Sequence, residues 1–149
     1  MFATQLSTLQ RTDKTNPRWA KTPGGKFHRL LFADLGNLGI SGASGIIVLW
    51  HGGLKPKWIY TDKSRDICRD LDAYLDNDEI MEFDIRGGVF ATWALVRPEY
   101  QDGVLKYLLQ SMSPVIDHPK PPKKNIEELP VLSPGEEPMG EYDLQIDPV

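Results

Sequence analysis

Two short runs of consecutive apolar residues constrain most strongly what this chain can fold into. Residues 45–51 read GIIVLWH, and residues 89–96 read VFATWALV. Neither run alternates with polar residues, as a strand with one solvent-facing side would, and glycines stand next to both. Such runs are typical of strands that are covered on both faces. The sequence therefore predicts two strands of one small sheet, with residues 89–96 as its central strand.

A second β-rich run, WIYT at residues 58–61, follows the first apolar run after a short connection. That connection, residues 52–57, reads GGLKPK and so contains two glycines and a proline. Two β-rich runs joined by a short segment rich in turn-forming residues indicate a β-hairpin.

The spacing of apolar residues then changes to that of a helix. Residues 64–75 read SRDICRDLDAYL, with apolar side chains three or four positions apart and charged residues between them. Ser64 or Asp66 can cap the start of this helix, because either side chain can accept hydrogen bonds from unpaired backbone amides. A short second turn is expected at residues 79–83.

A further helix is predicted from Pro98 to about Met112, because proline is favoured in a first turn and Ser113-Pro114 provides a stop. The resulting order is β-β-α-β-α. We expect an α/β fold of the α+β kind: a small mixed sheet, made of the hairpin and the central third strand, with helices packed on it.

Both ends of the chain differ from this middle part. Residues 1–30 carry a net charge of +5 and residues 111–149 a net charge of −5, and eight of the twelve prolines lie between Pro114 and Pro148. We therefore expect three parts: a basic N-terminal arm and lead-in over residues 1–43, an α/β domain over 44–116, and a proline-rich acidic tail over 117–149.

The proline-rich tail is expected to be extended, with disorder from residue 118 onward as the favoured interpretation. Its scattered hydrophobic residues leave a second possibility, that they lie in a groove on this chain or on a partner. These residues are Ile126, Leu129, Val131, Leu132, Met139, Tyr142, Leu144 and Ile146.

Composition excludes several classes of protein. The net charge of −4 argues against a strongly basic nucleic-acid binder. A single cysteine, Cys68, excludes an intramolecular disulfide and a cysteine-based zinc site, and it is expected to be an ordinary, partly buried residue despite its neighbour Arg69. We find no apolar run long enough for a membrane span and no secretory signal, so a cytoplasmic location is expected.

The order of these elements resembles the GIY-YIG nuclease domain over roughly residues 44–116. The resemblance rests on a Ser-Gly-hydrophobic strand, a hairpin, a second strand ending in tyrosine, and the helix start KSRDI at residues 63–67. It continues through GGVFATWA at residues 87–94 and the helix with DGVLKYL at residues 102–108. The resemblance implies phosphodiester hydrolysis, with a tyrosine to activate water, an arginine to neutralise phosphate, and a glutamate to hold one divalent cation.

Most of the reactive groups that the resemblance implies are missing here. The first tyrosine falls at Ile47 and the metal-binding glutamate at Leu105, neither of which has a polar atom to offer. The second tyrosine is present as Tyr60. The helix arginine falls at Asp70, and the glycine of the second motif has become Asp62, so negative charge stands where phosphate would approach.

We therefore expect a degenerate GIY-YIG-like module that does not cleave and that binds a protein partner through its body and through residues 118–149. One alternative is a Mg²⁺-dependent nuclease with rearranged catalytic residues, namely Tyr60, Arg69 and Asp102. The other is a non-cleaving nucleic-acid binder that uses the basic leader together with Lys55 and Lys57. The candidate binding residues are Lys55, Lys57 and Trp58, and no metal site or cofactor is expected unless the nuclease alternative holds.

Three histidines, His28, His51 and His118, are far apart in the sequence. We expect them to be isolated hydrogen-bonding or exposed residues rather than joint ligands of a metal.

Overall fold

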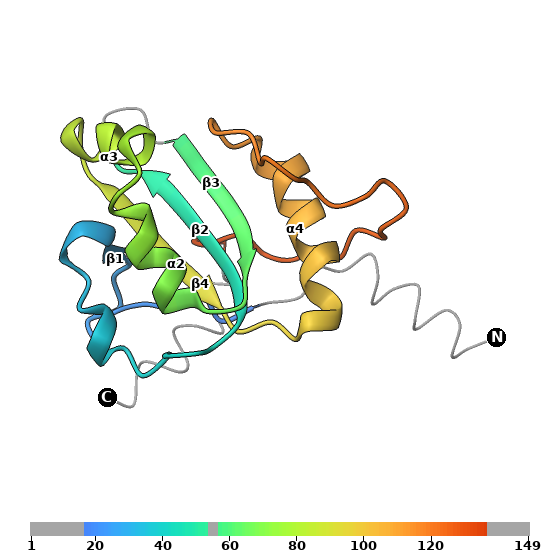
Figure 1. Cartoon of the computed structure of the whole chain (residues 1–149), viewed down its shortest axis with the longest axis horizontal. Helices are drawn as coiled ribbons and strands as arrows, with labels where there is room; N and C mark the ends of the chain where they lie inside the picture. Colours follow the sequence, from blue (N-terminus) through green and yellow to red (C-terminus); the bar gives the residue numbers. More distant parts are fainter. Residues whose placement is uncertain (1–16, 54–56, 137–149) are drawn as a thin grey trace.

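The computed structural model describes residues 17–53 and 57–136, which form a four-stranded sheet with helices on both faces (Figure 1). The strands are β1 (His28–Arg29), β2 (Gly45–His51), β3 (Lys57–Ser64) and β4 (Val89–Ala94), in the spatial order β1-β4-β2-β3. The predicted α+β class and the hairpin β2–β3 are confirmed. The third predicted strand, β4, is an inner strand, as expected.

All strand pairs are antiparallel, which differs from the mixed sheet that the sequence suggested. The reason is the path between β3 and β4. The two helices of that connection return the chain to the end of the sheet where β3 begins. β4 therefore runs in the direction of β3 and antiparallel to its neighbour β2.

The connecting helices are α2 (Ile67–Tyr74) and α3 (Asp78–Ile85). Asp66 is the N-cap of α2, since its carboxylate accepts a hydrogen bond from the Arg69 amide at 3.3 Å. α3 is longer than the turn expected at residues 79–83, because Asn77 caps its start by accepting from the Ile80 amide at 3.0 Å.

α4 spans Pro98–Met112, as predicted, and ends at Ser113, whose φ of 48° lies in the left-handed region. The left-handed residue turns the chain out of the helix and directs the following segment back along the sheet.

The sheet separates two hydrophobic cores. Side chains alternate along β2, so Ile47 and Leu49 face α2 and α3, while Ile46 and Val48 face α4. All four are fully buried. This explains why the first apolar run in the sequence shows no alternation of apolar and polar residues.

Residues 17–43, which were expected within an arm and lead-in, pack against the outer edge of β4. Trp19 and Leu30 are buried, and the short strand β1 pairs with β4. The Ala20 amide donates to the Trp93 carbonyl at 2.9 Å. These contacts satisfy backbone groups that an open sheet edge would leave unpaired.

The segment after α4 crosses back over that helix (Figure 1). We call residues 123–133 the strap. Lys106 on α4 donates to two strap carbonyls, those of Lys124 at 2.7 Å and Ile126 at 2.6 Å. The Leu129 amide donates to the Gly103 carbonyl at 3.1 Å.

The strap ends against the N-terminal part of the domain. Val131 is buried, and Trp19 Nε1 donates to the Leu132 carbonyl at 2.7 Å. The prediction that the tail is disordered from residue 118 onward is therefore wrong for the described residues up to 136. For these residues, the alternative prediction holds, in which the tail lies against this chain. Burial of apolar side chains and hydrogen bonding of the backbone offset the entropy of ordering it. Four of the scattered hydrophobic residues, Met139, Tyr142, Leu144 and Ile146, lie outside the described residues.

Candidate functional site

Tyr60, which matches the second tyrosine that the GIY-YIG resemblance implies, lies in a small hydrogen-bonded group on the edge strand β3. The Tyr60 hydroxyl donates to Asp62 Oδ2 at 3.2 Å, and His118 Nε2 lies 2.7 Å from Asp62 Oδ1. The rings of Tyr60 and His118 stack, with centroids 5.8 Å apart and an interplanar angle of 14°. We call Tyr60, Asp62 and His118 the edge cluster.

The hydrogen bonds of His118 assign its tautomer. Nδ1 accepts from the Lys120 amide at 3.0 Å, so it carries no proton. Nε2 therefore carries the proton and donates it to Asp62. Through these two hydrogen bonds, the imidazole holds the loop 113–121 against β3.

The same loop covers the outer edge of β3 with backbone hydrogen bonds. The Val115 amide donates to the Trp58 carbonyl at 3.0 Å, and the Ile116 amide donates to the Ile59 carbonyl at 2.9 Å. Covering an edge strand in this way prevents it from pairing with other chains.

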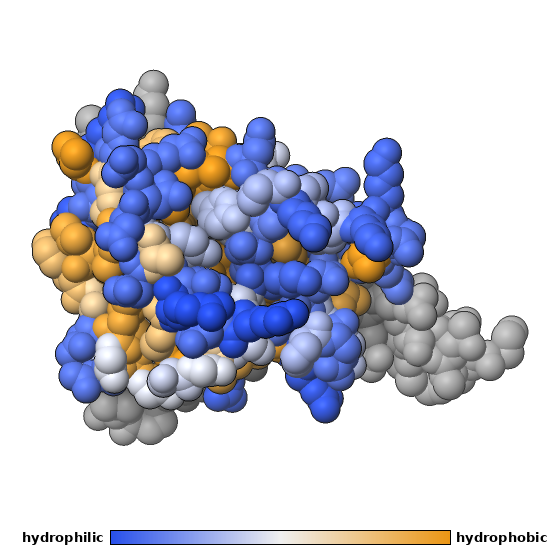
Figure 2. All heavy atoms as spheres, in the orientation of Figure 1, coloured by the Kyte–Doolittle hydropathy of each residue, from blue (hydrophilic) through white to orange (hydrophobic). Residues whose placement is uncertain are grey.

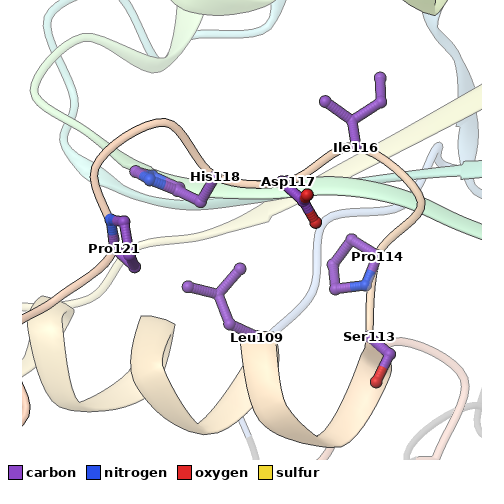
Figure 3. Close-up of a pocket in the computed structure, with 7 residues that line it drawn as sticks. All are labelled: Leu109, Ser113, Pro114, Ile116, Asp117, His118 and Pro121. Atoms are coloured by element: carbon purple, nitrogen blue, oxygen red, sulfur yellow. The ribbon is translucent and has the colours of Figure 1, made fainter.

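Two of the cavities beside this loop include residues of the edge cluster. The larger has a volume of about 450 Å³ and is lined by Leu109, Ser113, Pro114, Ile116, Asp117, His118 and Pro121 (Figure 3). The smaller, of about 270 Å³, is lined by Tyr60, Tyr74, Asn77, Ile80, Ile116, Asp117 and Pro119. Residues Ile116 and Asp117 line both and separate them.

The two tyrosines at the smaller cavity are weak acids. Burial raises the pKa of Tyr60 above its usual range, and the charge of the nearby Asp62 carboxylate raises that pKa further. Burial also raises the pKa of Tyr74, with Asp62 again adding to the effect. Both phenols therefore stay protonated near neutral pH, and Tyr60 acts as a hydrogen-bond donor.

Acidic side chains surround this group on the side of α2. Asp70, at the position where the resemblance implies an arginine, accepts a hydrogen bond from the Ser64 hydroxyl. Ser64 Oγ in turn accepts from the Asp66 amide at 3.1 Å. The helix start is thus built on carboxylates and a hydroxyl, which repel rather than attract a phosphate.

The three residues considered as rearranged catalytic groups each have other partners in the described structure. Arg69 is largely exposed on α2, with its Nε 3.8 Å from Asp70 Oδ1. Asp102 on α4 accepts from Lys63 Nζ at 2.8 Å, on the opposite face of the sheet from Tyr60. Among the described residues, no hydrogen bond or ion pair joins Tyr60 to Arg69 or to Asp102.

The other two positions of the implied centre are buried in separate cores. Ile47, on β2, is 0% exposed in the core on the α2 side of the sheet. Leu105, on α4 itself, is 1% exposed in the core between that helix and the sheet. Neither position opens onto a surface where a substrate or a cation could bind.

The predicted binding residues lie at the start of β3. Lys57 is exposed, whereas Trp58 is half-buried and packs edge-on against Trp50, with ring centroids 5.9 Å apart. Trp58 therefore packs partly against the core between the sheet and α4. Lys55 lies outside the described residues.

Cys68 has a raised rather than a lowered pKa. Burial raises the pKa of its thiol, and the Asp66 charge adds to this. Its Sγ donates to the Leu35 carbonyl at 3.4 Å. An ordinary structural cysteine fits these contacts, and the neighbouring Arg69 does not activate it.

A feature that the sequence did not reveal is the exposure of three large apolar side chains, Leu31, Phe32 and Ile85, which we call the exposed apolar surface. Phe32 is 71% exposed and Ile85 is 86% exposed. Figure 2 shows hydrophobic side chains gathered on the side of the molecule where β1 and α3 lie, at the left of the view. Consecutive apolar residues such as Leu31 and Phe32 usually indicate burial in a core. The sequence pattern alone therefore does not show that these two side chains are exposed.

Arg29 connects the two parts of this apolar surface. Its guanidinium lies over the Phe32 ring, 4.8 Å from the centroid, and its Nη2 is 3.3 Å from Asp84 Oδ2. Asp84, next to Ile85, is buried and also accepts from the Val89 amide at 2.9 Å. Because Arg29 is paired with Asp84, its guanidinium is held in place beside the end of α3 and packs against the Phe32 ring.

Within residues 17–53 and 57–136, no three histidine, cysteine or acidic side chains gather closely enough to hold a metal ion. No helix in the described part of the chain is both long and apolar enough to cross a membrane. Comparison with protein-family models, with curated proteins and with solved structures finds no match to this chain.

Proposed function

We propose that this chain is a non-catalytic, GIY-YIG-like module that binds a protein partner, in a cytoplasmic setting. The observation that carries the proposal is the exposed apolar surface of Leu31, Phe32 and Ile85, with Arg29 lying over the Phe32 ring. Exposed clusters of large apolar side chains mark interaction surfaces, and aromatic residues beside arginine are enriched among those that dominate binding energy.

A non-catalytic role is supported by the residues found at the positions where the resemblance implies catalytic groups. Tyr60 is a protonated donor to Asp62, Asp70 replaces the phosphate-binding arginine, and Ile47 and Leu105 are buried. Loss of a single stabilising electrostatic group typically costs about 10²–10³ in rate, and here several are missing together.

The body of the module is a better place to test partner binding than its tail. Deleting residues 118–149 would remove His118 from Asp62 and Val131 from its core. A loss of binding after that deletion would therefore not separate a binding role from loss of the fold. Substitutions on the exposed apolar surface avoid this difficulty.

The test is quantitative capture of partner proteins by the full-length chain, compared with a Phe32→Ser/Ile85→Ser double variant. Leu95→Ser/Tyr100→Ser is the matched control, since these residues are also large, apolar and exposed but lie at the end of β4 and on α4. We expect the Phe32/Ile85 variant to lose about tenfold or more of a specifically captured protein, and the control to keep it.

Both double variants should have the circular dichroism spectrum of the native chain, because the four side chains are exposed. The proposal fails when no protein is captured specifically, or when the two double variants retain the same captured protein equally well.

A further inference from the structure

The larger of the two cavities lies between the last turn of α4 and the loop 113–121. Its volume of about 450 Å³ falls in the range of roughly 300–1,000 Å³ that is usual for ligand sites. Figure 3 shows Leu109 pointing from α4 toward the loop, with Ser113 and Pro114 at one end and His118 and Pro121 at the other.

The charge of this cavity is negative. Asp117 is the only carboxylate among the residues that line it in the described structure, and no lysine or arginine lines it. Asp117 makes no ion pair with any described residue, and Figure 3 shows its carboxylate directed to the α4 side of the loop.

The end of α4 adds to this negative potential. The aligned peptide groups of a helix place partial negative charge on the carbonyl groups of its last turn. α4 is fifteen residues long and has no basic residue in that turn. The helix end and the Asp117 carboxylate therefore favour the same kind of ligand, a cation.

The walls of the cavity indicate which kind of cation fits. Leu109, Pro114 and Pro121 provide apolar surface, and Ser113 provides a hydroxyl acceptor at one end. A cavity that combines apolar walls with a carboxylate matches a side chain with a methylene stem and a charged head, which describes arginine and lysine. A bare metal ion fits poorly, because a single carboxylate lines the site.

The cavity is also held in shape before any ligand binds. The backbone hydrogen bonds of Val115 and Ile116 to β3 fix the middle of the loop, and the bond from His118 to Asp62 fixes its far side. A preformed site binds more tightly, because less conformational entropy is lost on binding.

We propose that this cavity binds the guanidinium or ammonium side chain of a basic peptide segment, with Asp117 as its counter-charge. The proposal rests on the proposed function in that the peptide belongs to a protein partner. It concerns a different surface, however, since neither Phe32 nor Ile85 lines the cavity.

The test is a titration of the ¹⁵N-labelled full-length protein with acetyl-Gly-Gly-Arg-Gly-Gly-amide, followed by NMR at the backbone amides of residues 113–121. The matched probe carries citrulline, a neutral residue of the same shape, in place of arginine. We expect saturable shifts with the arginine peptide and binding about tenfold weaker with the citrulline peptide, because hydrogen bonds between charged groups are the stronger ones.

Matched substitutions locate the binding site. Asp117→Asn removes the carboxylate of the cavity, whereas Asp72→Asn removes one exposed carboxylate from α2, away from the cavity. Asp117→Asn should weaken binding of the arginine peptide by about fivefold or more, and Asp72→Asn should leave it within about twofold of the native value.

The proposal is overturned by the absence of saturable shifts, by equal binding of the arginine and citrulline peptides, or by equal effects of the two substitutions. The Phe32→Ser/Ile85→Ser variant separates this outcome from that of the proposed function, because it should bind the arginine peptide like the native chain. Partner capture that fails while the arginine peptide binds would refute the protein-binding role of the apolar surface and leave the cavity site standing.

Discussion

The Tyr60 hydroxyl donates a hydrogen bond to the Asp62 carboxylate, two residues further along β3. The same carboxylate accepts from His118, which is 56 residues further along the chain. A tyrosine that the GIY-YIG resemblance would place in a cleavage centre thus forms part of the attachment between the sheet edge and the loop after α4.

The first prediction concerns the contribution of this hydrogen bond to stability. Tyr60→Phe removes the donor but keeps the ring that stacks on His118, so we expect the free energy of unfolding to fall by about 0.5–1.5 kcal/mol. Urea unfolding at neutral pH measures the change. Tyr100→Phe, on an exposed ring, is the control and should change stability by less than about 0.5 kcal/mol.

The second prediction concerns stability at alkaline pH. The pKa values of Tyr60 and Tyr74 are raised in the folded state, so the unfolded chain releases these protons at lower pH than the folded chain does. This contribution is fully present below the unfolded pKa of about 10 and is lost as the pH rises above that value.

The free energy of unfolding, measured in urea between about pH 8 and pH 11, should therefore decrease toward the upper end. The decrease should be smaller in Tyr60→Phe/Tyr74→Phe, which lacks both phenols. An equally steep decrease in this double variant would show that other groups cause the alkaline loss.

The third prediction concerns the close approach of the strap to α4. A Cβ atom at Gly103 would lie 2.7 Å from the Glu127 carbonyl oxygen and 2.7 Å from Leu129 Cγ. Gly103→Ala should therefore cost about 1–3 kcal/mol of stability, although alanine favours helix by about 1 kcal/mol over glycine.

Limited proteolysis of the same variant should cut within residues 123–133 faster than in the native chain, because the strap loses its fit on the helix. Ser111→Ala, at an exposed position of the same helix, is the control and should leave both stability and cleavage almost unchanged. Unchanged proteolysis of Gly103→Ala would contradict the tight packing of the strap.

Those parts of the fold that depend on local pattern could be predicted from the sequence. The bounds of α4 follow from Pro98 and from the stop after Met112, and the hairpin follows from two β-rich runs around a Gly- and Pro-containing connection. β1 could not be predicted, because a strand of two residues shows no periodicity.

Contacts in the site between residues that are far apart in the sequence could not be predicted either. His118 pairs with Asp62 and Trp19 with Leu132 across 56 and 113 residues, and no local signal links such positions. The order of the strap was missed for the same reason, since its partner groups on α4 are far away in sequence. Phe32 is linked to the end of α3 through Arg29, which lies over the Phe32 ring and pairs with Asp84.

We propose that Tyr60 has a structural role and that the chain does not cleave nucleic acid. The most direct measurement is incubation of the purified protein with single-stranded, double-stranded and branched DNA in the presence of Mg²⁺ or Mn²⁺. We predict no cleavage product from the native chain and none from Tyr60→Phe. A product formed by the native chain and abolished by Tyr60→Phe would contradict this account.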